Sequence, residues 1–429
     1  MSIRRRTGTN SGLGPSSRNL SGITETAVPE SDERNGGEAS VFATVLPPND
    51  GKLYHGVFAS RAENEPSPGG TCEAEWYAEE YPRRYLSQAR PFVPEQQRGL
   101  AWFLFGNNWR DESCRRFPME TCRWIWDLPD DGSHVVPYLY LFTKSIERRF
   151  EPDPRYYLLD IIDGKFDDEF RSWARGAREF GHPLMVAWGA ECNGYWHSWN
   201  GMYNGIDKLR RGQAGHFEGP ARFVDAYRHI INVMDSEGAT NVNWIFEVAG
   251  HDNPNTSNQF HDWNSFELYY PGDDYITWVA VSIYGEQSGE LILPEDEAAV
   301  SFNAQFEQFH SRLTAMKDAG AMARDKPLIV GEFGCCAASR QNPDVTQDEQ
   351  AAKWAGAALT EMFSGKASGK YPDLIGFSWW NEAWTNGEQE PDTEMRIQEI
   401  PSLGSTFATL LRERESLLQE RMNTASNHG

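Results

Sequence analysis

The sequence predicts a (β/α)₈ TIM barrel. Two observations support this fold: eight short apolar runs have the length of buried strands, and amphipathic helical stretches separate them. Strands that alternate with helices run parallel and are joined by right-handed crossovers, and eight such units match the count of a barrel. A doubly wound open sheet is the main alternative. It is disfavoured because the chain has no G-x-G-x-x-G or G-x-x-x-x-G-K-[ST] phosphate turn.

The expected strands are short segments of aliphatic, β-branched and aromatic residues. They cover residues 53–59, 100–105, 135–142, 184–189, 242–248, 278–284, 328–333 and 375–380. Helices are expected at 167–181, 219–238, 303–320 and 348–365. In the first of these, Phe170, Trp173, Ala174 and Ala177 form one apolar stripe, and in the second Gly238 is a helix stop.

The chain is expected to hold one catalytic domain with an unstructured extension. Residues 1–50 are rich in Ser, Gly, Asn, Thr, Glu and Pro, which is typical of a disordered tail or linker. The barrel domain is expected over residues 51–412, and residues 413–429 are expected to form a helix end and a tail.

The net charge of -23 and the pI near 4.9 argue against nucleic acids or anionic membranes as partners, since phosphates would be repelled. A neutral polysaccharide would not be repelled. The apolar runs fall short of the roughly 20 residues needed to cross a bilayer. We expect a monomer. Its cellular location is open, because the start of the chain shows no export signal and such a segment could lie outside it.

The sequence offers no clear metal, cofactor or serine-hydrolase motif. Its cysteines lack metal-ligand spacing and are expected to be reduced and buried: Cys72, Cys114, Cys122, Cys192, Cys335 and Cys336. No His-x-x-x-His or paired-cysteine pattern points to zinc, and no G-x-S-x-G elbow occurs. We therefore expect no cofactor.

Polar and aromatic residues gather where the expected strands end, which is the catalytic face of a barrel. Glu191 follows the fourth expected strand and Glu332 ends the seventh, so the two should face each other across the barrel mouth. The other residues of this set include His55, Asn107, Asn108, Trp109, Asn193, Trp196, Trp199, Glu247, His251, Tyr284, Trp379, Trp380, Asn381, Glu382 and Trp384.

Two acids across a pocket lined with indoles suit the hydrolysis of a glycosidic bond. Glu191, in an aromatic-rich loop, suits the proton donor. Glu332, between glycines and within reach of Tyr284, suits the nucleophile. Apolar walls should raise the pKa of the acid, while hydrogen-bond donors should keep the nucleophile ionised. If the enzyme retains configuration, the carboxyl groups should lie about 5 to 5.5 Å apart.

Each residue also has a plain structural interpretation. A single strand-end glutamate is usually solvated or ion-paired, and most tryptophans of a barrel belong to its core. Asn193 is either a helper of the reaction or a loop former. His55, His197 and His251 are interpreted as structural, hydrogen-bonded groups.

Five segments taken together resemble glycoside hydrolase family 26, over roughly residues 50–412: "ECNGYWHSWNG", "GPARFVDAYRHI…GATNVNWIFE", "WNSFELYYPGDDYITWVAVSIYG", "KPLIVGEFG" and "GFSWWNEAW". This family of (β/α)₈ retaining endo-glycanases includes β-mannanases, mixed-linkage β-glucanases and β-1,3-xylanases.

The resemblance implies Glu191 as acid/base and Glu332 as nucleophile, with Tyr284 bonded to the nucleophile. It also implies Trp196 as a sugar contact, and Trp379 or Trp380 as the platform under the sugar. Many members carry a histidine immediately before the acid/base, whereas this chain has Ala190.

The sequence therefore predicts a retaining endo-β-1,4-glycanase acting on mannan or mixed-linkage glucan, with Trp109, Asn193, His55 and Trp199 among its substrate contacts. Two alternatives stay open: a non-catalytic carbohydrate-binding relative, and a transglycosylase acting on an exopolysaccharide.

Overall fold

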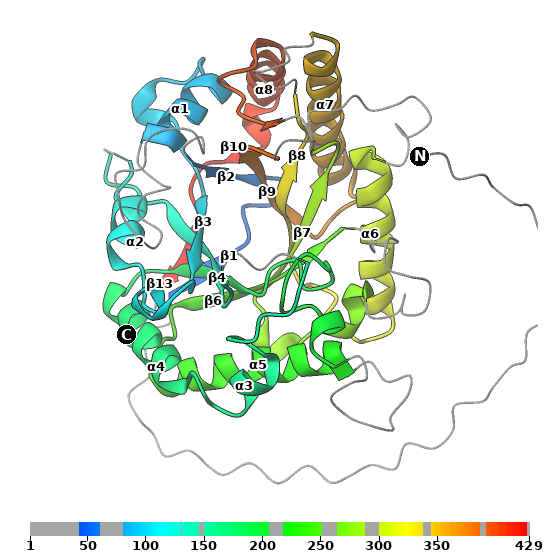
Figure 1. Ribbon diagram of the computed structural model, residues 1–429. Coiled ribbons are helices and arrows are strands. Elements are labelled where there is room, and N and C mark those ends of the chain that lie inside the picture. Colours follow the sequence, from blue (N-terminus) through cyan, green and yellow to red (C-terminus); the bar gives the residue numbers. More distant parts are fainter. Residues whose placement is uncertain are drawn as a thin grey trace, which may run out of the picture. The chain divides into compact units, whose positions relative to one another are not determined.

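The computed structural model describes residues 43–60, 80–129, 131–145, 150–205, 218–250, 264–287, 300–337, 345–386 and 392–426. Within the unit that spans Val41–Gly429, parallel strands form a closed ring and helices surround it (Figure 1). The ring closes because β2 pairs with both β3 and β9. The predicted TIM barrel is confirmed.

The eight barrel strands follow one another around the ring in chain order. Their bounds are β2 Leu53–Ala59, β3 Trp102–Asn108, β4 Val136–Phe142, β5 Leu184–Trp188, β6 Val242–Ala249, β7 Trp278–Tyr284, β8 Leu328–Gly334 and β9 Leu374–Asn381. Each coincides with one of the apolar runs expected to be a strand. Because side chains of a strand alternate between its two faces, one set fills the barrel and the other meets the helices.

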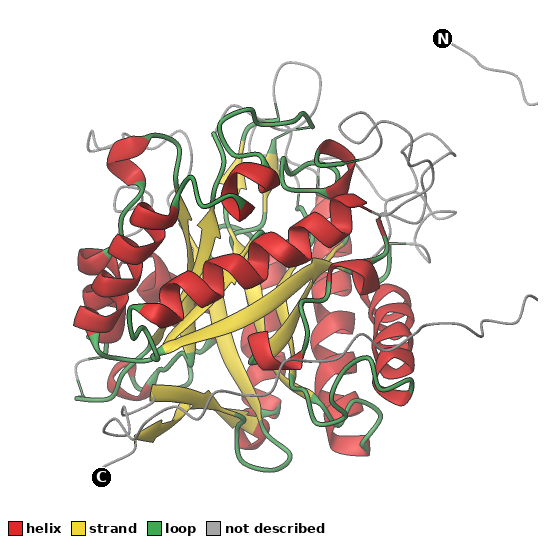
Figure 2. Cartoon of the chain, turned by 90° about the horizontal axis from the view of Figure 1, so that it is seen from below, coloured by secondary structure: helices red, strands yellow, loops and turns green. Residues whose placement is uncertain are grey.

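The helices form an outer ring around the strands in Figure 1, and in Figure 2 they lie in front of and beside the strands. They are α1 Glu80–Ala89, α2 Met119–Trp126, α3 Leu158–Ile162, α4 Asp167–Phe180, α5 Glu218–Ser236, α6 Phe302–Asp318, α7 Val345–Ser368 and α8 Pro401–Glu413. In α4 the predicted stripe is buried, and Gly181 ends the helix with a φ of 74°. A left-handed residue after a helix favours glycine, which has no Cβ to clash.

Short strands at both ends of the described chain lie outside the predicted elements. Strand β1, Ala43–Leu46, pairs antiparallel with β13, Asn423–Ser426. Strand β12, Leu418–Gln419, adds to β2 beside the barrel. The expected tail therefore does not extend to residue 50, and residues after α8 return to the barrel instead of forming a helix end and tail. Residues 1–42 lie outside the described ranges.

The cysteines only partly follow the expectation of reduced, buried thiols. Cys122, Cys192, Cys335 and Cys336 are free and buried. Cys114 is disulfide-bonded, so the expectation is wrong for this residue. Cys72 lies outside the described residues.

Candidate active site

A β-bulge aims Glu332 into the barrel. Val281 of β7 pairs with Val330 of β8, whereas the next residue, Ser282, pairs with Glu332. Gly331 is therefore an extra residue in β8, and an extra residue reverses which face the following side chains take. Without it, Glu332 would share the face of Val330, which points toward the helices. With it, Glu332 joins the interior set and is 7% exposed.

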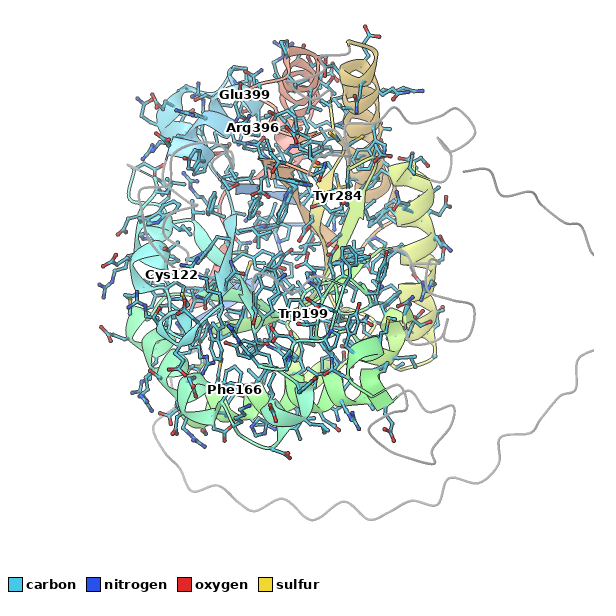
Figure 3. All side chains as sticks on the ribbon, viewed as in Figure 1. Cys122, Phe166, Trp199, Tyr284, Arg396 and Glu399 are labelled. Atoms are coloured by element: carbon cyan, nitrogen blue, oxygen red, sulfur yellow. The ribbon has the colours of Figure 1, made fainter. Side chains whose placement is uncertain are left out.

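Tyr284 at the end of β7 holds the carboxylate of Glu332. Its hydroxyl donates to Oε2 of Glu332 over 2.6 Å, so the predicted hydrogen bond is present. Figure 3 shows Tyr284 beside the barrel strands, whereas Phe166 lies near the outer edge of the molecule.

Glu191 lies in a left-handed backbone turn after β5. Its φ is 51°, one of two positive values at non-glycine residues within the described ranges. Such a conformation costs about 1 to 3 kcal/mol and persists where surrounding contacts enforce it. Here the amide of Glu191 donates to the carbonyl of Glu247 over 3.0 Å, and Gly194 donates back to Glu191 over 2.7 Å. The turn directs the carboxylate to Trp196, whose Nε1 donates to Oε2 over 2.7 Å.

A third carboxylate, Glu247 on β6, lies inside the barrel beside this pair. The hydroxyl of Tyr138 donates to its Oε2 over 2.5 Å, and that of Tyr140 donates to its Oε1. Glu247 is 2% exposed. A Cβ at position 331 would approach its Oε1 to 2.5 Å, so the bulge glycine also makes room for this acid. The sequence places Glu247 among the strand-end residues without predicting a role for it. Its position inside an apolar run was the available signal.

The charge of Glu191 raises the pKa of both interior acids, Glu247 and Glu332. Burial and the charges of Glu191 and Glu247 raise the pKa of Glu332 well above its ordinary value, although Tyr284 and Tyr140 act in the opposite direction. Burial raises the pKa of Glu247 to about 7, despite the donors Tyr138 and Tyr140. Hydrogen bonds from Tyr284 and Tyr140 thus act as expected on the pKa of Glu332, but burial and like charges outweigh them.

Strand β9 carries two adjacent tryptophans, Trp379 and Trp380, and Trp380 faces the barrel interior. Its ring stacks on Phe58 of β2, with centroids 3.7 Å apart and planes 2° from parallel. Its Nε1 donates to Glu382 Oε2 over 3.0 Å, and Ser60 donates to the other oxygen of Glu382 over 2.8 Å. Trp380 is half-buried, as a platform for a ligand must be.

Three predicted substrate contacts, His55, Trp109 and Trp379, are instead fully buried between the strands and the helices. His55 bonds to Tyr85 of α1 over 2.9 Å, and Trp379 donates to the carbonyl of Met395. Trp109 stacks on Phe170 of α4, with centroids 4.8 Å apart. A side chain without an exposed face cannot contact a sugar, so these three predictions are corrected.

Asn193 and Trp199 are also buried, but they hold the loop that carries Glu191. Asn193 exchanges two hydrogen bonds with the backbone of Ala249, at 2.9 and 3.0 Å. Trp199 donates to the carbonyl of Ala190 over 3.1 Å. Both are therefore loop-forming residues and not substrate contacts. His251 lies outside the described residues.

Among the residues that the structure describes, no group of three or more His, Cys, Asp or Glu side chains has an arrangement that could hold a metal ion. Of the described helices, none is both long and apolar enough to span a membrane.

The chain resembles a known protein over part of its length. No family model matches it. Over 274 residues, or 63% of its length, the chain is 23% identical to Endoglucanase H of Acetivibrio thermocellus. The chain spans about a quarter of that protein, 25% of its length.

Solved structures share the fold. The catalytic domain of the GH26 endo-beta-1,4-mannanase of Bacillus sp. JAMB-750 superposes with a TM-score of 0.51 at 14% identity, covering 86% of this chain and 87% of the other. The GH26 beta-mannanase of Bacteroides ovatus gives a TM-score of 0.50 at 13% identity, covering 86% and 90%. The chain is similar to glycoside hydrolase family 26. The resemblance seen in its motifs is thus confirmed at the level of the fold.

Proposed function

We propose that the protein is a retaining endo-β-1,4-glycanase that hydrolyses mannan or mixed-linkage glucan. The observation that carries the proposal is the pair of carboxylates, Glu191 and Glu332, set at the carboxyl end of the barrel with separate partners, Trp196 and Tyr284. The two acids interact electrostatically, since the charge of Glu191 raises the pKa of Glu332. The endoglucanase and mannanase relatives support the same reaction class.

In the proposed mechanism, ionised Glu332 attacks the anomeric carbon while Glu191 gives its proton to the leaving oxygen. The glycosidic bond breaks and a glycosyl ester forms on Glu332. Ionised Glu191 then takes a proton from water, whose oxygen attacks the same carbon and releases Glu332 as a carboxylate. Trp380 is the proposed platform under the sugar, in place of Trp379, and Trp196 remains a proposed sugar contact.

Glu332 must be ionised before it attacks the anomeric carbon. Because burial and neighbouring charges raise the pKa of Glu332, the acid limb of the kcat/KM profile is expected above the usual carboxylate range. The separation of about 5 to 5.5 Å between the two carboxyl groups stays a prediction.

The test is hydrolysis of mannan and of mixed-linkage glucan, with the anomer of the first product followed by NMR. Retention supports the proposal, and inversion would refute the mechanism. Glu332→Ala should abolish turnover of every substrate, whereas Glu191→Ala should spare aryl glycosides whose leaving group needs no proton. Products longer than the substrate would indicate a transglycosylase, and binding without products would indicate a carbohydrate-binding relative.

A further inference from the structure

A histidine and a lysine stand behind the carboxylate of Glu191. Nε2 of His197 lies 3.5 Å from Oε2 of Glu191. The other ring nitrogen, Nδ1, lies 3.4 Å from Nζ of Lys144. The three side chains therefore form a line from the loop after β4 to the acid, and His197 is 12% exposed within it.

The lysine fixes the tautomer of the imidazole. An ammonium group donates hydrogen bonds and accepts none, so Nδ1 of His197 must present its lone pair to Lys144. In a neutral ring the proton is then on Nε2. This nitrogen faces Glu191, so the ring presents a donor to the carboxylate.

Aromatic contacts hold the ring in place. His197 stacks on Trp199, with centroids 4.3 Å apart and planes 19° from parallel. Trp199 is fixed in turn by its bond to the carbonyl of Ala190. Nζ of Lys144 lies 4.7 Å from the ring centre of Phe142 and 5.3 Å from that of Trp199, distances at which a cation is attracted to a ring face. Figure 3 shows Trp199 toward the middle of the molecule.

We propose that His197, oriented by Lys144, is a positioning residue for Glu191 and supplies the imidazole that is missing at Ala190. Both Trp196 Nε1 and His197 Nε2 face the same oxygen, Oε2. When Glu191 is protonated, its proton therefore sits on Oε1, because a proton on Oε2 would face two donors. The inference rests on the proposed function, and it goes beyond the interpretation of His197 as a structural, hydrogen-bonded group.

Several charged or titratable groups interact electrostatically with Glu191. They are Lys144 through His197, Cys192 beside it in the loop, Glu247 on β6, Tyr284 on β7 and Glu332 on β8. Among these groups, His197 can be substituted while the interior acids and Tyr284 stay unchanged.

Two variants separate the donor from the stacking. His197→Phe keeps a ring over Trp199 and removes the donor, whereas His197→Gln keeps an N–H near the position of Nε2. Lys144→Met keeps the apolar stem over the aromatic rings and removes the charge. His229→Gln is the matched control, since His229 also contacts a carboxylate, Asp167, at 2.7 Å. Thermal unfolding establishes that each variant is folded.

On polysaccharide, His197→Phe is expected to lose roughly 10- to 100-fold in kcat/KM, because the imidazole 3.5 Å away would no longer position the carboxylate of Glu191. The loss should be much smaller on aryl glycosides with activated leaving groups, which need no proton. His197→Gln should recover most of the rate. In His197→Phe and Lys144→Met, the basic limb of the profile should move to higher pH, because ionised Glu191 loses stabilisation. Equal losses on both substrate types, or an unmoved basic limb, would overturn the proposal.

A measurement without substrate keeps this inference separate from the proposed function. Nitrogen NMR of the His197 ring should show a neutral imidazole protonated on Nε2, whose signals shift in Glu191→Gln. A ring protonated on Nδ1, or signals insensitive to Glu191, would refute the positioning role even if the protein hydrolyses no glycan. Absence of turnover in the wild type, with the expected ring signals, would instead refute the proposed function.

Discussion

Replacing Glu247 by glutamine should remove a loss of stability that the wild type suffers as pH rises. Glu247 is buried, and burial raises its pKa from 4.5 to about 7. Below pH 4.5 the group is protonated in both the folded and the unfolded chain. Between pH 4.5 and about pH 7 the unfolded chain releases the proton and the folded chain keeps it. The free energy of unfolding therefore falls as pH rises through this range.

The magnitude follows from the shift in pKa. A change from 4.5 to about 7 corresponds to about 3 kcal/mol, since one unit is worth 1.36 kcal/mol. The loss is complete above pH 7. Glutamine cannot ionise and still offers an oxygen to Tyr138 or Tyr140. The free energy of unfolding of Glu247→Gln, relative to the wild type, should therefore rise by about 3 kcal/mol from about pH 4 to about pH 8.

Urea unfolding at steps across this pH range measures the difference. Glu179→Gln serves as the control, because the side chain of Glu179 is 73% exposed, and its curve should follow the wild type. If the difference between Glu247→Gln and the wild type stays constant with pH, Glu247 does not hold a proton in the folded state and the account of the coupled acids is wrong.

Three further outcomes are expected. Gly331→Ala should destabilise the protein by about 1 to 3 kcal/mol and lower turnover, because the new Cβ would lie 2.5 Å from Oε1 of Glu247; urea unfolding and activity measure both. Trp380→Ala should weaken binding of a β-1,4-linked oligosaccharide by about 1 to 3 kcal/mol in calorimetry, and unchanged affinity would remove it from the site. Burial opposes ionisation of Asp373, but two donors from α6 hold its pKa at about 2. Asp373→Asn should therefore destabilise the protein by about 2 to 3 kcal/mol at neutral pH, and this difference should vanish as pH falls from about 4 to about 2.

The strands were predictable because each barrel strand is buried on both faces and so reads as a continuous apolar run. The pair of β1 and β13 was not predictable in this way. Both are four residues long, and β13, Asn423–Ser426, consists of small and polar residues without an apolar pattern. Their pairing depends on bringing the two ends of the barrel domain together, which no local pattern encodes.

The sequence located the strand ends that carry the candidate site, but it did not show which face of each strand a residue occupies. His55 and Trp379 belong to strands next to each other in the ring, but their side chains point outward. The residues adjacent to them in sequence, Tyr54 and Trp380, point inward: Tyr54 stacks against Trp278 across the barrel, and Trp380 stacks on Phe58. Counting alternate residues from one interior position would have separated these sets.

Alternation alone would have misplaced Glu332. Counted along β8 from Val330, which faces the helices, every second residue points outward, and Glu332 would be one of them. The bulge at Gly331 reverses this order and brings Glu332 opposite Ser282, inside the barrel. A glycine inside a strand often marks a bulge or a close approach of another group. Here both apply, since Gly331 shifts the register and leaves space for Oε1 of Glu247. The glycine before the proposed nucleophile is therefore part of the candidate site, because a side chain at that position would displace the carboxylate of Glu247.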